Sequence, residues 1–233
     1  MTIKKNINID EIAHMLCQMW GPHSEEQSVI LKSHIRVALF KKNEIIFREN
    51  ETPAMMMCLI NGKVKVYKDG VGHHQIIRAI KPVEFFGFRA YFAHDSYRTS
   101  AMALEPSTIA MLPLHVVEQL MAENPHIAIY LMRQLASLLG DSDRRTVNLT
   151  QKHIRGRLAE ALIFLKDNYG LEEDGYTLSI YLSREDLANL SNMTTSNAIR
   201  TLSAFAAERL IAIDGRKIKI IQEEELRKIS SMG

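Results

Sequence analysis

Four polar residues, Thr195, Ser196, Asn197 and Arg200, lie close together in the stretch Ser183–Ala206, SREDLANLSNMTTSNAIRTLSAFA. Hydroxyl, amide and guanidinium groups can form hydrogen bonds with phosphates and with the base edges of DNA. A helix of about 3.6 residues per turn would place Ser196 and Arg200 on the same face. This face is therefore a candidate for DNA binding, and a helical hairpin with a solvated face is the alternative.

The same stretch predicts two helices joined by a tight turn. Ser183 can cap the first helix, with Asp186 three residues later, and Thr194 can cap the second. Asn192 tolerates the left-handed conformation that a connecting turn requires. Met193 could fill the corner between the helices. Small and apolar residues at helical spacing would form the buried side: Leu187, Ala188, Leu190, Ala198, Leu202 and Phe205. An apolar back and a short polar front are the layout of a helix-turn-helix.

The chain has 233 residues, of which 46% are hydrophobic and 24% are charged. This length and composition are typical of a soluble protein with about two domains. No apolar run approaches the roughly 18 residues of a membrane span, and residues 1–15 lack an apolar secretory core. We therefore expect a cytoplasmic protein without membrane contact.

The two cysteines, Cys17 and Cys58, lie far apart and form no CxxC motif. Their number and spacing predict a reducing compartment and no disulfide framework. An iron–sulfur cluster made by this chain alone is excluded, because such clusters need about four ligands. We expect no haem either, since the histidines are scattered along the chain, among them His14, His94, His126 and His153. No nucleophilic triad, phosphate-binding glycine loop or paired carboxylate motif is present, so we predict no enzyme.

The formal net charge is only +2, so bulk charge gives no argument for nucleic-acid binding. Residues 151–233 contain twelve basic and twelve acidic residues. Positive charge is concentrated between Arg144 and Arg157, where five Lys and Arg residues occur without an acid. These residues could contact phosphates. The alternative is that they form the solvated end of a helix and bind nothing.

Residues 37–112 consist of short apolar runs separated by turn residues. Many short strands at this spacing predict a β-sandwich or β-roll. Asn61-Gly62 predicts a hairpin because both residues accept positive φ, and Asn43 and Asn50 are candidates for further left-handed positions. Two short helices are expected before the strands, over residues 9–20 and 24–35, with Asp10 or Ser24 as capping residues.

A long helix is predicted to begin at Pro125, after a shorter one over residues 114–123. Its seam positions recur at steps of three and four: Ile127, Leu131, Leu135 or Gln134, Leu138, Ser142, Arg145 and Leu149. Such a seam predicts a parallel dimer, and packing of the helix on the β-domain is the alternative.

The remaining chain predicts a helix over residues 152–169, ended by Gly170, and a short strand over residues 176–182. Strands at 210–213 and 217–221 flank Asp214-Gly215 and form a hairpin, the wing of a winged helix. The expected fold class is α+β, with three parts: a β-roll domain with N-terminal helices (1–124), a dimerisation helix (125–150) and a winged helix-turn-helix domain (151–233).

This order of elements resembles the Crp/Fnr family of bacterial transcription regulators over nearly the whole chain. The resemblance rests on INGKVKVY at 60–67, on FFGF at 85–88 with RTSA at 98–101, on the long helix, and on LSREDLANLSNMTTSNAIRTL at 182–202. It implies a cyclic-nucleotide-binding-type β-roll that senses an effector. It also implies a homodimer on palindromic double-stranded DNA, with RNA polymerase as a further partner.

The resemblance carries over unevenly to the DNA-binding residues. Members that bind cyclic AMP present Arg-Glu-x-x-x-Arg to bases, and the matching residues here are Thr195, Ser196 and Arg200. Only the last arginine is retained, and it could read guanine through O6 and N7, worth about 1–3 kcal/mol of discrimination. Two further residues, Thr194 and Arg184, match positions that touch phosphates. Asn197 could read adenine or contact the backbone.

The effector site departs further from the family pattern. The family places a Gly-Glu pair and an Arg-Ser pair around a cyclic nucleotide, and this chain has Gly87-Phe88 and Arg98-Thr99. Phe88 removes the carboxylate that would bind the ribose hydroxyl. Ser142 matches a threonine that meets the adenine ring across the dimer. We therefore expect an effector other than cyclic AMP, and an Arg98 that forms an ion pair within the roll is the alternative.

The sequence thus predicts a dimeric, sequence-specific DNA-binding transcription regulator, modulated by an effector bound in the β-roll. One alternative is a constitutive regulator with a vestigial pocket. Another is a ligand-binding signalling module whose helix-turn-helix binds protein.

Overall fold

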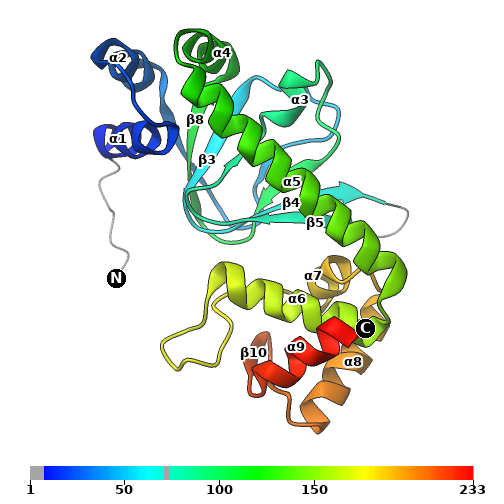
Figure 1. Ribbon diagram of the computed structural model, residues 1–233. Helices are drawn as coiled ribbons and strands as arrows, with labels where there is room; N and C mark the ends of the chain where they lie inside the picture. The colour runs from blue at the N-terminus through cyan, green and yellow to red at the C-terminus, as the bar shows by residue number, and fades with distance from the viewer. Residues whose placement is uncertain (1–7, 71–73, 233) are drawn as a thin grey trace. The chain divides into compact units, whose positions relative to one another are not determined.

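The computed structural model describes residues 8–70 and 74–232 (Figure 1). The chain divides into two compact units. The first comprises the described residues of Met1–Lys68 and Arg78–Gly140, and the second those of Asp69–Ile77 and Asp141–Gly233. No helix in these described ranges is both long and apolar enough to cross a membrane. The expected α+β architecture is confirmed, with a β-roll in the first unit and a winged helix-turn-helix in the second.

Two helices precede the β-roll, α1 (Ile9–Trp20) and α2 (Glu25–His34), close to the predicted ranges. The side chain of Asn8, not Asp10, caps α1, because its Oδ1 accepts a hydrogen bond from the backbone N–H of Asp10. Ser24 caps α2 as expected and forms a reciprocal capping box with Gln27.

The β-roll consists of two four-stranded sheets. The first has the order β1 (Arg36–Phe40), β8 (Ser107–Pro113), β3 (Met55–Asn61), β6 (Phe85–Phe86). The second has the order β2 (Ile45–Phe47), β7 (Ser100–Ala103), β4 (Val64–Asp69), β5 (His74–Ile80). Side chains from both sheets form one apolar cluster: Phe47, Met57, Leu59, Val64, Val66, Ile80, Phe86, Tyr97, Ala101 and Ile109.

Gly62 connects β3 to β4, and these two strands lie in different sheets. The hairpin predicted at Asn61-Gly62 is therefore wrong, although Gly62 does adopt φ +101°. A Cβ atom on Gly62 would lie 2.7 Å from Cα of Ser107 and 2.8 Å from the carbonyl oxygen of Pro106. Glycine is required here both for its φ and for the close approach of β8. The left-handed conformations expected at Asn43 and Asn50 are confirmed.

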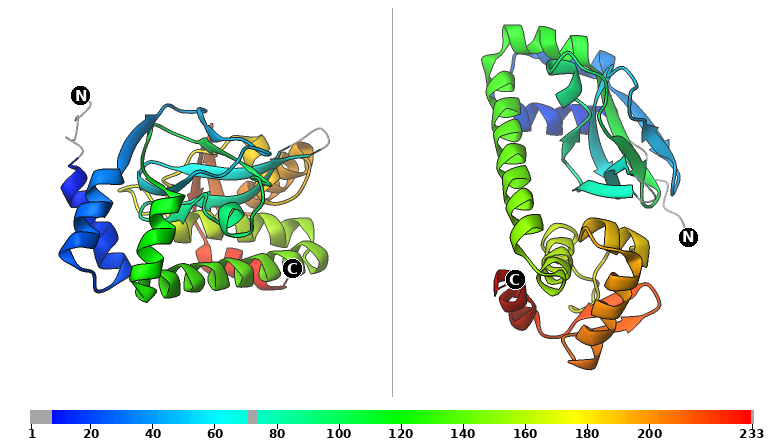
Figure 2. Two further views of the ribbon diagram at one scale, coloured as in Figure 1. Left: turned by 90° about the horizontal axis from the view of Figure 1, so that it is seen from above. Right: turned by 90° about the vertical axis from the view of Figure 1, so that its right-hand side faces the viewer.

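Two short helices, α3 (Arg89–Phe92) and α4 (Leu114–Glu123), complete the first domain, and α5 (Pro125–Gln151) follows as one long helix (Figure 2). Ile127 and Leu131 are each 2% exposed and belong to the apolar core formed with α1 and α4. The first two positions of the predicted seam thus pack inside the chain. The side chain of Leu149, another seam position, lies outside the described residues.

The second unit contains α6 (Ile154–Tyr169), α7 (Arg184–Leu190), α8 (Thr195–Ala207), the hairpin of β9 (Ile211–Asp214) and β10 (Lys217–Ile220), and α9 (Glu223–Met232). The strand expected over residues 176–182 is reduced to isolated bridges, because Leu178 pairs with Leu171 and Thr177 with Lys219. The terminal helix α9 was not predicted.

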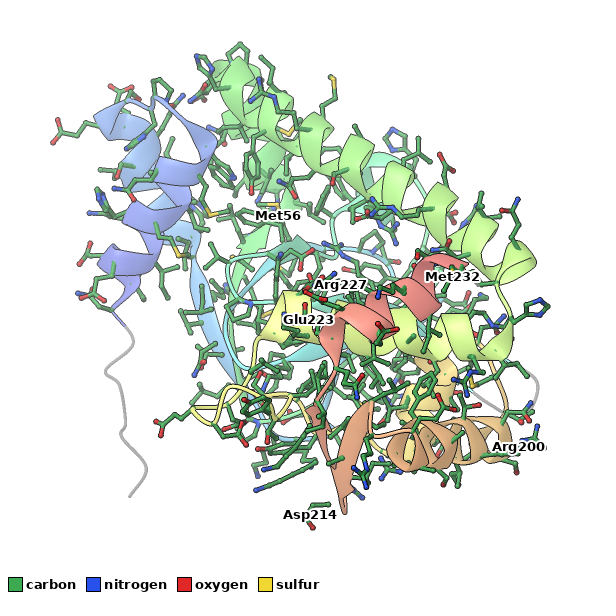
Figure 3. The ribbon with its side chains drawn as sticks, turned by 60° about the horizontal axis from the view of Figure 1, so that its bottom comes forward. Met56, Arg200, Asp214, Glu223, Arg227 and Met232 are labelled. Atoms are coloured by element: carbon green, nitrogen blue, oxygen red, sulfur yellow. The ribbon has the colours of Figure 1, made fainter. Side chains whose placement is uncertain are left out.

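Ion pairs join α9 to α6. Lys166 Nζ lies 2.6 Å from Glu223 Oε2, and Arg227 Nη2 lies 2.7 Å from Asp167 Oδ1. Arg227 also pairs with Glu223 on its own helix, and Figure 3 shows these two side chains next to each other on α9. The hydrogen bond from Lys166 is the main cause that holds the pKa of Glu223 below its ordinary value.

Candidate nucleic-acid interface and effector site

The helix-turn-helix is built by the capping and turn residues that the sequence predicted. Ser183 Oγ accepts a hydrogen bond from the backbone N–H of Asp186 at 3.0 Å and so caps α7. Asn192 adopts φ +49° in the turn. Thr194 Oγ1 accepts from the backbone N–H of Asn197 at 3.3 Å and caps α8. These local bonds set the point at which each helix begins.

One side of α8 is buried in the core of the second unit, at Ala198, Leu202 and Phe205 as predicted. The opposite side is exposed at Thr195, Ser196, Ile199, Arg200 and Ser203. Figure 3 shows Arg200 on this exposed side of α8. The helix therefore presents a face of short polar groups, one guanidinium and one isoleucine.

Asn197 and Arg200 contact each other on the exposed side. Arg200 Nη2 donates a hydrogen bond to Asn197 Oδ1 at 2.7 Å, one helical turn earlier. Asn197 is half-buried, whereas Arg200 is exposed. The amide oxygen that could have faced a base instead orients the guanidinium.

Arg184 connects the first residue of α7 to the wing. Its Nη2 donates a hydrogen bond to the carbonyl oxygen of Gly215 at 2.6 Å, in the turn between β9 and β10. Asp214, at the tip of the same hairpin, is labelled in Figure 3. Lys217 lies on the second wing strand, with its Nζ 5.8 Å from the centre of the Tyr181 ring. The wing is thus fixed by side chains from the segment that precedes and begins α7.

Asp174 stabilises the turn that leads into the helix-turn-helix. Its carboxylate accepts hydrogen bonds from the backbone N–H groups of Tyr176 and Thr177 and from the hydroxyl of Thr177. Lys219 of the wing lies 3.2 Å from Oδ2. These donors, the Thr177 hydroxyl first, hold the pKa of Asp174 far below its ordinary value.

The basic segment from Arg144 to Arg157, which runs from α5 into α6, is largely paired within the chain. Arg155 forms two hydrogen bonds with the carboxylate of Glu208, at 2.8 and 2.7 Å, and lies over the ring of Phe205. The bond to Glu208 raises the pKa of Arg155 and lowers that of Glu208. Two other members also have acidic partners, since Arg144 pairs with Asp141 and Lys152 with Glu160. Arg155 thus joins α6 to the end of α8, and its positive charge is used within the fold.

In the β-roll, the predicted effector residues point in different directions. Gly87 has φ +83°, and a Cβ atom there would lie 2.7 Å from Met57 Cε. Phe88 is fully buried in the core shared with α1 and α4 and meets Phe92 edge to face. Its side chain therefore stabilises the fold and does not line the interior of the roll.

Arg98 is exposed and donates from Nε to Asp95 Oδ2 at 2.6 Å. Thr99 is half-buried beside it. The residue before them, Tyr97, turns inward and stacks on Phe47 with ring centres 4.0 Å apart. The hydroxyl of Tyr97 lies 3.5 Å from where a Gly87 Cβ would be. Burial raises the pKa of Tyr97 to about 12. The hydroxyl of a buried tyrosine of the chain itself therefore lies beside Gly87.

Ser142 is exposed on α5 and belongs to the second unit, whereas the other predicted effector residues belong to the first. Its carbonyl oxygen accepts a hydrogen bond from Thr146 Oγ1 at 3.0 Å. Cys17 and Cys58 are buried free thiols. In the described part of the chain, no three His, Cys, Asp or Glu residues are grouped as metal ligands.

Comparison with known protein families assigns both domains. A model of the cyclic nucleotide-binding domain matches residues 38–124, and a model of the Crp-like helix-turn-helix domain matches residues 156–229. The chain belongs to the Crp/Fnr family of transcription regulators. The predicted family is thereby confirmed, and with it a DNA-binding regulator that is not an enzyme.

Curated members of the Crp/Fnr family are similar over most of their length. The CRP-like cAMP-activated global transcriptional regulator of Mycobacterium tuberculosis is 24% identical over 191 residues, which cover 81% of this chain and 85% of the relative. The transcriptional activator protein Anr of Pseudomonas aeruginosa is 24% identical over 190 residues, covering 80% and 77%.

Solved structures of similar proteins show the same fold. FixK2 from Bradyrhizobium japonicum superimposes with a TM-score of 0.75 at 21% identity, covering 84% of this chain and 96% of that one. A putative Crp/Fnr regulator from Eubacterium rectale gives a TM-score of 0.76 at 16% identity, covering 91% and 99%.

Two residues of this Crp/Fnr regulator were missed by sequence reasoning. Tyr97 directly precedes the Arg98-Thr99 pair in a segment without regular structure, so no periodic pattern indicated its burial. Ile199 lies one position before Arg200, and helical spacing alone could have placed it on the exposed face with Ser196.

Proposed function

We propose that this Crp/Fnr regulator binds a palindromic double-stranded site as a homodimer, with α8 of each subunit in the major groove. The observation that carries the proposal is the two-sided construction of α8, which is buried on one side and exposes Thr195, Ser196 and Arg200 on the other. A helix-turn-helix places the N-terminal residues of its second helix against base edges. Half-sites about 34 Å apart then match the two-fold symmetry of a dimer.

The roles of the contact residues follow from their reach. Arg200 reads a guanine through O6 and N7, and Asn197 orients it. Ser196 and Thr195 have short side chains, so they contribute hydrogen bonds at close range. Thr194, at the N-terminus of α8, contacts a phosphate where the helix dipole favours negative charge. Arg184 contacts a second phosphate from the wing side.

An exposed apolar strip on α5 supports the homodimer. Ile129, Met132, Leu135 and Leu139 are 37–66% exposed and follow one another at steps of three and four. This strip lies on another side of the helix from Ile127 and Leu131, which the core has already buried. Contiguous exposed apolar surface marks a site of protein association. A second α5 offers a matching strip with coiled-coil spacing.

For the β-roll, the position of Tyr97 favours a regulator with a vestigial pocket. The relative from Mycobacterium tuberculosis is cAMP-activated by name. Here the Tyr97 hydroxyl lies beside Gly87, Phe88 is in the core, and Arg98 pairs with Asp95. A cyclic nucleotide bound at Gly87 would meet the Tyr97 hydroxyl and would find no glutamate at position 88 for its ribose. We therefore infer that the roll is a packed structural domain that does not respond to cyclic nucleotides.

RNA polymerase is a further proposed partner, because a transcription regulator acts on transcription initiation through DNA, polymerase or both. A cytoplasmic location is also proposed, because a transcription regulator acts where the bacterial DNA lies. The two buried free thiols are compatible with this reducing compartment.

Selection of bound sequences from a random double-stranded DNA pool tests the DNA-binding proposal. We expect a palindrome to be recovered, with an affinity that falls as salt rises, because phosphate contacts release counterions. Fluorescence anisotropy with the selected duplex measures both properties. A protein that recovers no sequence, and whose weak DNA binding ignores salt, would instead support a helix-turn-helix that binds protein.

A further inference from the structure

Ile199 is the large apolar residue on the exposed face of α8. Its side chain is 47% exposed, while Ala198, Leu202 and Phe205 on the other side are almost completely buried. A single exposed isoleucine is ordinary on a protein surface. What distinguishes Ile199 is its position, directly before Arg200 and one turn after Ser196 on the face assigned to base reading.

The position of Ile199 within α8 brings it near base edges. It is the fifth residue of the helix, which begins at Thr195, and the N-terminal residues of a recognition helix are those that reach bases. In the major groove, guanine, cytosine and adenine present polar groups, whereas thymine adds a C5-methyl group. Apolar contact with Ile199 would leave a polar base edge without a hydrogen-bond partner, and this has a free-energy cost.

We propose that Ile199 recognises the C5-methyl group of a thymine in each half-site, close to the guanine read by Arg200. The inference rests on the proposed DNA-binding function and adds a specificity-determining residue to it. The closeness of the two bases follows from the adjacency of the two residues and from the bond to Asn197, which draws the guanidinium back along the helix.

Replacement of thymine by uracil tests the contact, because it removes one methyl group and leaves base pairing intact. Starting from the palindrome selected by the wild-type protein, each thymine is replaced symmetrically by uracil, and affinity is measured by fluorescence anisotropy. We expect one position at which the wild type loses about fourfold per half-site, as for one buried methyl group. Ile199→Ala should bind the thymine and uracil duplexes equally, and Ile199→Val should keep the preference.

Ile221→Ala is the matched control, because Ile221 is also an isoleucine, 45% exposed, in the same unit but outside α8. It should discriminate thymine from uracil as the wild type does. Circular dichroism checks folding, and alanine at an exposed helical position favours the helix. The proposal is overturned if no uracil substitution weakens binding, or if Ile199→Ala retains the preference. Failure to select any DNA would instead refute the proposed function itself, so the two failures are distinguishable.

Discussion

Arg200 Nη2 donates to Asn197 Oδ1 at 2.7 Å, and both side chains belong to the first two turns of α8. A guanidinium that is held in this way loses less side-chain freedom when it meets a base. Asn197 is therefore assigned to positioning Arg200, although its residue type alone is also suited to reading adenine.

A double-mutant cycle on these two residues should show that they act together. We expect Arg200→Ala to lose about 1–3 kcal/mol of discrimination at one guanine. Asn197→Ala should cost less, about 0.5–1.5 kcal/mol, the net value of one hydrogen bond. In the Arg200→Ala background, Asn197→Ala should cost nothing more. Losses that simply add in the anisotropy titrations would mean that Asn197 contacts the DNA independently.

Substitution of Leu139 by glutamate should disrupt the proposed dimer, because Leu139 is 64% exposed in the apolar strip of α5. Two carboxylates facing each other across the α5 pair repel and lose solvation. Light scattering should give the mass of a dimer for the wild type and of a monomer for Leu139→Glu. Val29→Glu is the control, since Val29 is 60% exposed on α2. A monomeric wild type, or a dimeric Leu139→Glu protein, would refute the assignment.

Cyclic nucleotides should leave the melting temperature of the wild type unchanged, because Tyr97 stacks on Phe47 and its hydroxyl lies beside Gly87. A ligand that binds the folded state raises this temperature by mass action, so a rise with cyclic AMP or cyclic GMP would contradict the vestigial pocket.

Tyr97→Ala should lower the free energy of unfolding by about 3–5 kcal/mol, as for other large aromatic truncations. Tyr97→Phe keeps the stacked ring and serves as the control.

Acid should weaken the contact between α6 and α9 through Glu223. Its pKa is depressed in the folded state by the hydrogen bond from Lys166 and then by that from Arg227. The stabilisation is therefore present above the unfolded pKa of about 4.3 and is lost as pH falls below it.

Thermal unfolding of Glu223→Gln should accordingly show lower stability at neutral pH and a smaller further loss on acidification. Glu224→Gln provides the comparison, since Glu224 is exposed on the next position of α9. If the melting temperatures of the wild type and Glu223→Gln fall in parallel as pH is lowered, the ion pair of Glu223 does not account for the acid sensitivity.

The helix-turn-helix could be predicted almost residue by residue because its determinants are local. Ser183 and Thr194 cap the helices whose starts they precede, and Asn192 adopts the left-handed turn. The spacing of Ala198 and Leu202 then decides which side of α8 is buried. All of these interactions join residues close together in the chain.

The β-roll was harder to predict because its decisive contacts are distant in sequence. Asn61-Gly62 is compatible with a hairpin and with a connection between two sheets. The structure has the connection, from β3 to β4, with Ser107 of β8 packed closely against Gly62. Similarly, the helical period of α5 identified its apolar residues but not their partners. Ile127 was therefore assigned to a dimer contact, whereas it packs in the core formed with α1 and α4. Tyr97 was overlooked because the family motif begins one residue later.

The hydrogen bond from Arg184 to the carbonyl oxygen of Gly215 has a thermodynamic consequence for the phosphate contact proposed for Arg184. An unrestrained arginine on a surface samples many rotamers, and ordering it opposes association by about 0.5–1.5 kcal/mol. Arg184 is already ordered by the wing turn, so most of this conformational entropy is lost during folding. A phosphate bound by Arg184 would therefore meet a preorganised charge, and the entropic cost of recognition at this point would be small.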